Sequence, residues 1–150
     1  MGIFSESTEK KLNELLEKSY DAEQGFKKAA ENIESNALQK FFMSKAEERL
    51  QFRNELRQEI VANGCDITKQ NGSISGFLHR AWMDTKALFS SENEETMLEE
   101  VRNGEKAALN DYNEVLEDQL LPPTTTSILK KQRDAIQRSY DKANYLEKAL

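Results

Sequence analysis

Two stretches of the sequence resemble each other, residues 16–33 and 98–115, and each carries an acid where the helical pattern calls for an apolar residue. The acids are Glu23 in the first stretch and Glu105 in the second, and the offset between them also aligns the first and the last residues of the two stretches. Apolar residues at three- and four-residue steps are typical of one face of an amphipathic helix. The partial duplication therefore predicts two helical hairpins packed about a pseudo-two-fold axis.

Four long helices are predicted from this periodicity, at about residues 8–33, 36–62, 92–119 and 125–149. They have similar lengths, as a four-helix bundle requires. The breaks inside each pair are short: one lies near Ser35, and the other contains the adjacent prolines Pro122 and Pro123, which a helix interior does not tolerate. Helices joined by short loops pack antiparallel, so each pair is expected to form a hairpin.

The two pairs are separated by a long connection at residues 64–91, which contains an amphipathic segment at about residues 75–89. A connection of this length with a short helix of its own is typical of a crossover that runs along a bundle. We therefore predict an all-α, ferritin-like four-helix bundle in which two helical hairpins are joined by a long crossover. Residues 8–150 are expected to form this single domain, after a flexible N-terminus at residues 1–7.

The composition argues against several classes of partner. The net charge is −6 and no block of basic residues is present, so a nucleic-acid partner is not expected. No apolar run approaches the roughly 18 residues that a membrane span needs, so no membrane partner is expected. The first residues lack the basic and apolar regions of a signal peptide, and the one cysteine, Cys65, excludes an internal disulfide. These features predict a cytoplasmic protein.

The two acids occupy positions that bind metal in a known type of bundle. In ferritin-like di-iron proteins the first and third helices each supply a Glu, and the second and fourth each supply Glu-x-x-His. Glu23 and Glu105 match the first pair, but the predicted second helix places Arg49 and Phe52 at the other positions. The predicted fourth helix has neither Glu nor His at its matching turn, and the one histidine, His79, lies on the crossover. Half of the expected ligand set is therefore missing.

Three interpretations of the acids remain open. The favoured one is a metal-free core in which Arg49 neutralises Glu23 and Glu105, because a buried carboxylate is costly unless it is paired. The alternative is a divergent site in which the two acids, helped by Glu48 or Gln51, hold iron or manganese. In the third interpretation the acids face the solvent.

The crossover offers a candidate partner surface. Phe77, Trp82 and Phe89 line one side of the amphipathic segment, although covering the flank of the bundle itself explains this pattern equally well. His79 lies off this side and has no second His or Cys nearby, so we expect a surface or structural histidine and no ligand or proton shuttle.

No sequence motif predicts ordinary enzyme chemistry. Cys65 follows a helix-ending glycine and lacks a His-paired motif, so it is not expected to be a nucleophile. The sequence contains no Gly-rich phosphate loop, no Gly-x-Ser-x-Gly and no His-Glu-x-x-His. Four tyrosines at helical spacing are predicted to lie in the core or at its rim: Tyr20, Tyr112, Tyr140 and Tyr145.

Three short motifs resemble a bacterial family that is described only as a domain of unknown function and is placed in the ferritin-like group. They are Gly-Ser at residues 72–73, His-Arg-Ala-Trp at 79–82 and Gly-Glu-Lys-Ala-Ala at 104–108. The resemblance extends from about residue 12 to residue 146. It implies a four-helix bundle in a bacterial cytoplasm, linked to stress physiology, with no established reaction. Relatives often carry a His at the position of Tyr140, so the resemblance also implies that a helix-four ligand is missing here.

The sequence thus favours a non-enzymatic, ferritin-like structural or interaction protein without a di-iron centre, with self-association as one route by which it would act. The alternative, from a different class, is a carboxylate metalloprotein that uses Fe or Mn for oxygen or peroxide chemistry. Substitution of both Glu23 and Glu105 by Gln separates the two. A metal site would lose its metal and keep its stability, whereas a salt-bridged core would be destabilised because Arg49 would be left buried without a charge partner.

Overall fold

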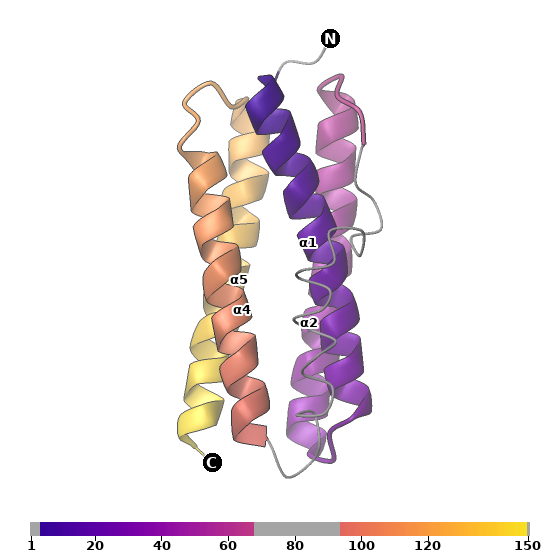
Figure 1. Cartoon of the computed structure of the whole chain (residues 1–150), viewed down its shortest axis with the longest axis vertical. Helices are drawn as coiled ribbons and strands as arrows, with labels where there is room; N and C mark the ends of the chain where they lie inside the picture. The colour runs from indigo at the N-terminus through magenta and orange to yellow at the C-terminus, as the bar shows by residue number, and fades with distance from the viewer. Residues whose placement is uncertain (1–3, 68–93, 150) are drawn as a thin grey trace.

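The fold is a bundle of long α-helices, given by a computed structural model that describes residues 4–67 and 94–149. The described helices are α1 (Glu6–Glu31), α2 (Asn36–Ala62), α4 (Glu94–Leu116) and α5 (Pro123–Lys148), and this part of the chain contains no strand. α1 packs along α2, and α4 packs along α5, so the chain forms two hairpins that stand side by side (Figure 1). The predicted all-α four-helix bundle is therefore confirmed. The predicted crossover helix at 75–89 lies outside the described residues.

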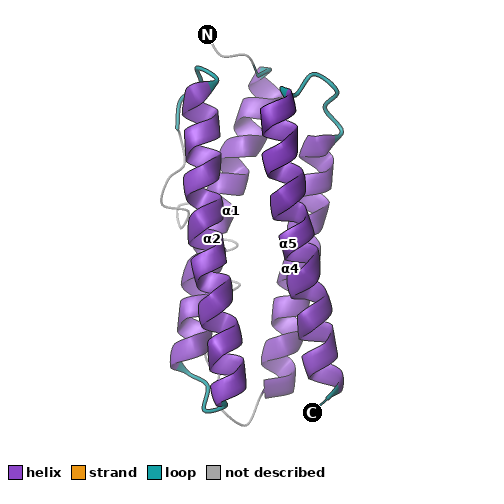
Figure 2. Ribbon diagram, turned by 180° about the vertical axis from the view of Figure 1, so that it is seen from behind, coloured by secondary structure: helices purple, strands orange, loops and turns teal. Residues whose placement is uncertain are grey.

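The two hairpins meet along two seams. α1 contacts α4, and α2 contacts α5, less extensively than the helices contact each other within a hairpin. The order around the bundle is therefore α1, α2, α5, α4, and both views show each helix running antiparallel to its two neighbours (Figure 1, Figure 2). α2 and α4 consequently lie diagonally opposite each other across the bundle.

The start of α1 differs from the prediction. The helix begins at Glu6, because the side chain of Ser5 accepts a hydrogen bond from the backbone N–H of Thr8 at 3.1 Å and so caps the first turn. Phe4, immediately before this cap, is buried in the core. The helix thus begins before the predicted residue 8, and the cap and Phe4 fall within residues 1–7, for which a flexible N-terminus is predicted.

The ends of α2 follow from local capping. Ser35 precedes the helix, and its hydroxyl accepts a hydrogen bond from the backbone N–H of Leu38 at 3.3 Å. The helix ends at Ala62, and Gly64 follows with a φ of 79°, a left-handed conformation that glycine adopts without strain. These bounds agree with the predicted range 36–62.

The second hairpin is joined by a turn that the sequence pattern does not place correctly. α4 ends at Leu116, earlier than the predicted residue 119, and the Asp118 carboxylate accepts a hydrogen bond from the backbone N–H of Leu120 at 2.9 Å. An aspartate side chain bonded two residues ahead forms a local turn that competes with the helix. α5 then begins at Pro123 without a side-chain cap, earlier than the predicted residue 125. Proline suits a first helical position, since its missing N–H would have no partner there.

The core consists of two clusters of buried apolar side chains, one toward each end of the bundle. The first apolar cluster comprises Ala22, Phe26, Ala29, Ala30, Ile33, Leu38, Phe41, Phe42, Ala46, Met97, Leu98, Val101 and Ala143. The second apolar cluster comprises Phe4, Leu12, Leu15, Leu16, Phe52, Leu56, Ile60, Cys65, Tyr112, Val115, Leu129, Ala135 and Ile136. Along α2 and α4, the buried charges Arg49 and Glu105 each fall between a member of the first cluster and a member of the second. A charged layer thus separates the two apolar cores.

Candidate functional site

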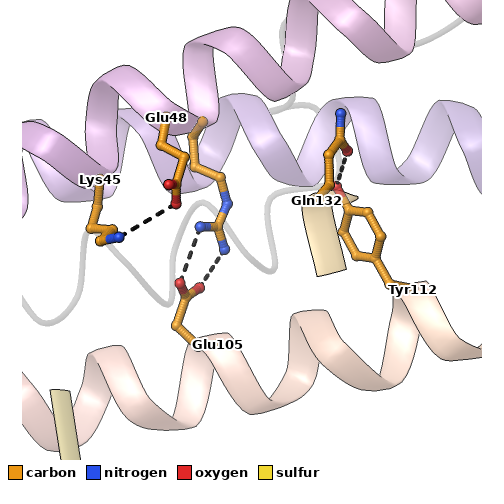
Figure 3. A network of polar contacts seen from close by, with 6 residues as sticks. Lys45, Glu48, Glu105, Tyr112 and Gln132 are labelled. Atoms are coloured by element: carbon orange, nitrogen blue, oxygen red, sulfur yellow. Dashed lines mark hydrogen bonds and ion pairs between the residues drawn. The ribbon is translucent and has the colours of Figure 1, made fainter. Parts of the chain in front are cut away.

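The centre of the bundle holds an ion pair between diagonally opposite helices, Arg49 on α2 and Glu105 on α4. Nη1 of Arg49 donates a hydrogen bond to Oε2 of Glu105 at 3.0 Å, and Nη2 donates to Oε1 (Figure 3). Their side chains are 3% and 1% exposed, so both groups are almost fully removed from bulk solvent. A two-point contact between a guanidinium and a carboxylate is among the strongest and most directional polar interactions in proteins.

The guanidinium of Arg49 is also enclosed by aromatic rings. It lies 5.7 Å from the ring centroid of Phe26 and 5.6 Å from that of Phe52, one residue from each apolar cluster. Both distances fit a cation–π interaction. Burial by itself would lower the pKa of Arg49, but the charge of Glu105 and its hydrogen bonds outweigh this effect and leave that pKa raised. Arg49 is therefore a permanently charged group in the core.

Glu23, the acid in the matching stretch, is neutralised in a different way. Its Oε2 lies 3.0 Å from Nζ of Lys27 one turn along α1, and its Oε1 lies 3.6 Å from Nη2 of Arg53 on α2. Arg53 in turn lies over the ring of Tyr20 at 5.1 Å from the centroid. The prediction that Arg49 pairs with both acids is therefore corrected for Glu23, which is buried but takes its cations from its own hairpin.

A second polar contact links three helices next to the ion pair. The hydroxyl of Tyr112 on α4 donates a hydrogen bond to Oε1 of Gln132 on α5 at 2.6 Å (Figure 3). Nε2 of Gln132 donates to the backbone carbonyl of Phe52 at 3.3 Å and to Oε1 of Glu55 at 3.0 Å, both on α2. Burial raises the pKa of Tyr112, which stays a neutral donor. Every polar atom of the Gln132 amide is thus engaged in joining the hairpins.

The sequence pattern did not identify Gln132. A signal was present, because Gln132 lies between the apolar residues Leu129 and Ile136, at a three-residue and a four-residue step that keep all three on one face of a helix. Ser139 was missed in the same way: it follows Ile136 by three positions and is fully buried, and its hydroxyl oxygen has no hydrogen-bond partner in the described part of the chain. Both polar side chains continue the inward stripe of α5.

A small cavity opens beside the ion pair on the seam between α1 and α4. Its volume is about 50 Å³, and Arg49 and Glu105 contribute to its lining together with small residues such as Ser19 and Gly104. Binding sites for small molecules are usually about 300–1,000 Å³, whereas one water occupies about 30 Å³ in the liquid. The cavity therefore suits one or two waters rather than an organic substrate.

The carboxylates of this centre do not fit a metal site. Both oxygens of Glu105 bond to Arg49. Oε2 of Glu23 pairs with Lys27, and its Oε1 lies 3.6 Å from Nη2 of Arg53 without a hydrogen bond in the described part of the chain. Of the helpers in the alternative interpretation, Glu48 pairs with Lys45 at 3.5 Å and Gln51 is exposed. Within residues 4–67 and 94–149, no group of three His, Cys, Asp or Glu side chains is placed to hold an ion. Cationic side chains occupy the contacts that a metal would need.

The remaining predicted site residues lie apart from this centre or outside the described chain. Cys65 is buried in the second apolar cluster, and burial raises the pKa of its thiol, which makes it a poor nucleophile. Tyr145 is exposed and Tyr140 is half-buried. His79 and the predicted partner surface of Phe77, Trp82 and Phe89 lie outside the described residues.

The chain matches the model of a sequence family. The family is described as "Domain of unknown function (DUF2383)", and its model matches residues 7–118, from the first turn of α1 to the turn after α4. The match includes both halves of the ion pair. No curated protein matches the chain in sequence. None of the described helices is long and apolar enough to cross a membrane.

Proposed function

The chain belongs to the DUF2383 family, and we propose that it is a non-enzymatic structural or interaction module without a di-iron centre. In this proposal it has the ferritin-like arrangement, in which two hairpins are joined by a crossover, and it acts in a bacterial cytoplasm with a stress-associated role. Its polar centre holds the two hairpins together and is not a reaction site. The resemblance stated for the motifs at 72–73, 79–82 and 104–108 supports the cellular setting.

One observation carries the proposal: the buried carboxylate of Glu105 is fully engaged by Arg49. A carboxylate that serves as a metal ligand offers its oxygens to an ion, whereas here each oxygen accepts a hydrogen bond from a guanidinium that stays charged. Replacing the guanidinium with a metal would leave Arg49 buried without a counter-ion, which is costly. The centre is therefore built for neutralisation by the protein itself.

Metal loading tests this proposal. The full chain is incubated with Fe(II) or Mn(II), desalted and assayed by elemental analysis beside a thermal melt. We expect substoichiometric metal and no change in the melting temperature. The Glu105→Gln variant should give the same low metal content, and so should the control Glu117→Gln, which changes an exposed acid in the α4–α5 turn.

The alternative function that this experiment tests is that of a carboxylate metalloprotein. Stoichiometric iron or manganese with a raised melting temperature, lost in Glu105→Gln and kept in Glu117→Gln, would overturn the proposal. In that outcome Arg49 would have to leave Glu105 when the ion binds. The variants Glu23→Gln and Glu105→Gln would then identify the ligands.

A further inference from the structure

The outer face of α2 carries a stripe of exposed residues that the other described helices do not cover. Met43, Leu50 and Val61 are 49%, 36% and 56% exposed. Three further exposed residues complete the stripe at steps of three and four positions, which keeps all six on one side of the helix. The stripe consists of Met43, Glu47, Leu50, Asn54, Arg57 and Val61.

This stripe distinguishes α2 from the other described helices. Three of the five large hydrophobic side chains exposed in the described residues lie on it; the other two are Leu120 in a turn and Tyr145 near the C-terminus. As a result, α2 has a weaker contrast between an apolar and a polar face than α1, α4 or α5. Met43, Leu50 and Val61 lie on one side of the helix with polar residues between them. The stripe therefore combines apolar and charged groups, as the surface of a non-obligate interface does.

The charges on the stripe are placed so that they would complement those of a second copy. Glu47 and Arg57 have no ion-pair partner within residues 4–67 and 94–149. If a second α2 is laid antiparallel on the first, Glu47 of each copy comes opposite Arg57 of the other. The same register places Met43 opposite Val61 and Leu50 opposite Asn54. All these pairs share one midpoint at position 52, so a single two-fold axis satisfies them together.

The surface beside Met43 is an open, shallow depression. A hollow lies there, lined by Gln39, Lys40, Met43, Ser44 and Glu47. In the antiparallel register, Val61 of the second copy comes to this hollow, and by symmetry Val61 of the first copy comes to the same hollow on the second.

We infer that the outer face of α2 is a homodimer interface, in which two copies of the chain pack their α2 stripes antiparallel about a two-fold axis at the level of residue 52. The inference deepens the proposed function by naming a second copy of the chain as the partner. The stripe from Met43 to Val61 is about 27 Å long at 1.5 Å per residue. One helix pair of this length buries an area at the low end for specific interfaces, so the dimer is reversible.

The first test is sedimentation velocity of the full chain over a range of concentrations. We expect a monomer–dimer equilibrium. Leu50→Asp buries a carboxylate against the second copy and should weaken dimerisation at least about ten-fold, which corresponds to ~1.4 kcal/mol. The control Leu120→Asp makes the same change at a residue that is 86% exposed in the α4–α5 turn, and it should leave the dimer unchanged. Circular dichroism checks that both variants are folded.

Charge exchange makes the test specific to the register. Glu47→Lys or Arg57→Glu alone places like charges opposite each other, and each variant should be largely monomeric. An equimolar mixture of the two variants should dimerise again, because both cross-copy pairs then have opposite charges. The chain carrying both substitutions should dimerise by itself. A wild-type chain that stays monomeric at every concentration, or a mixture no better than its components, would overturn the inference. Neither result bears on the metal-loading experiment, so the two proposals fail separately.

Discussion

Glu23 and Glu105 stand at matching positions of two similar stretches and are both buried, yet they are neutralised in different ways. Glu105 bonds through both oxygens to Arg49, which reaches it across the bundle from the diagonally opposite helix. Glu23 instead pairs with Lys27 one turn along its own helix and with Arg53 on the adjacent helix, at 3.0 and 3.6 Å. Neutralisation of Glu105 therefore depends on docking of the two hairpins, whereas neutralisation of Glu23 depends only on its own hairpin.

The partners of the two acids also differ in exposure. The side chain of Arg49 is 3% exposed, whereas Lys27 is 49% and Arg53 is 26% exposed. Water and salt screen an exposed cation but not a buried one. Two acids that the sequence pattern makes equivalent should therefore contribute very differently to stability, and the following experiments measure that difference.

The largest effect is expected for Glu105→Gln. The substitution keeps the shape of the side chain but leaves Arg49 charged and buried without a counter-ion, which should lower the free energy of unfolding by about 3–5 kcal/mol. Urea denaturation followed by circular dichroism measures it, with Glu117→Gln as the exposed control. A loss below about 1 kcal/mol would mean that water reaches Arg49 and that the pair is not insulated.

Removal of both charges should recover most of that loss. In the chain with Arg49→Met and Glu105→Leu, apolar groups of similar volume replace the pair, and such replacements are often neutral or stabilising by about 1–4 kcal/mol. We expect the double variant to unfold at a urea concentration close to that of the wild type. If the double variant is as unstable as Glu105→Gln, packing of the side chains, and not an unpaired charge, explains the single-variant loss.

The neutral contact in the same layer should contribute less. Tyr112→Phe removes the hydroxyl that donates to Gln132 and leaves a buried amide oxygen unbonded, at a cost of about 1–2 kcal/mol. The same urea titration measures this cost. Gln132→Ala in the Tyr112→Phe background should then add less than it does in the wild type, since the two side chains share one interaction. If the losses of the two single variants add up in the double variant, Tyr112 and Gln132 do not stabilise each other.

Glu23→Gln should have an effect of about 1 kcal/mol or less, because its cations are partly exposed. The loss should shrink further in 1 M salt, where the Debye length is about 3 Å, while the loss for Glu105→Gln stays constant. Unfolding titrations of both variants at low and high salt make this comparison. Equal salt dependence for the two acids would remove the distinction between the cross-bundle pair and the pair within the hairpin.

The smallest effect concerns a third acid, Asp118, in the α4–α5 turn. The hydroxyl of Thr8 donates to it at 2.5 Å, and with the N–H of Leu120 this lowers the pKa of Asp118. A lowered folded-state pKa adds stability above the ordinary carboxyl range, and that stability is lost as the pH falls through the folded-state value. Thr8→Val should raise this pKa toward its ordinary value and reduce the loss of stability on acidification. An NMR titration of Asp118 measures it, and an unchanged pKa would show that Thr8 has no part in it.

Much of the fold follows from the sequence because helical periodicity is local. The stripe from Leu38 to Ile60 at three- and four-residue steps predicts the buried face of α2, and Arg49 is a visible charge within that stripe. The sequence near Arg49 does not determine which acid it contacts. That choice depends on the rotation and register of one hairpin against the other, which many side chains set together. The role of Gln132 could not be predicted from the sequence for a similar reason, since its partners lie on two other helices.

The contacts at the helix ends show the same difference between local contacts, which the sequence predicts, and contacts between helices, which it does not. Ser5 caps α1 through its own third neighbour, so the start of that helix was within reach of the sequence. Threonine is a residue type that often caps helices, but the hydroxyls of Thr124 and Thr125, after Pro123, donate to Glu59 on α2, at 3.1 and 2.5 Å. A hydroxyl that has both a local and a distant acceptor available is assigned only by the packed structure.

The diagonal position of the Arg49–Glu105 pair has a consequence for how the two halves find their alignment. Apolar side chains of similar size tolerate sliding of one hairpin along the other, because methyl groups meet methyl groups in several registers. A slip of one helical turn, about 5.4 Å, would pull the two-point contact apart and leave both charges dehydrated. The pair therefore specifies the register of docking. Hairpins that dock in another register bury two charges without partners, and such complexes dissociate.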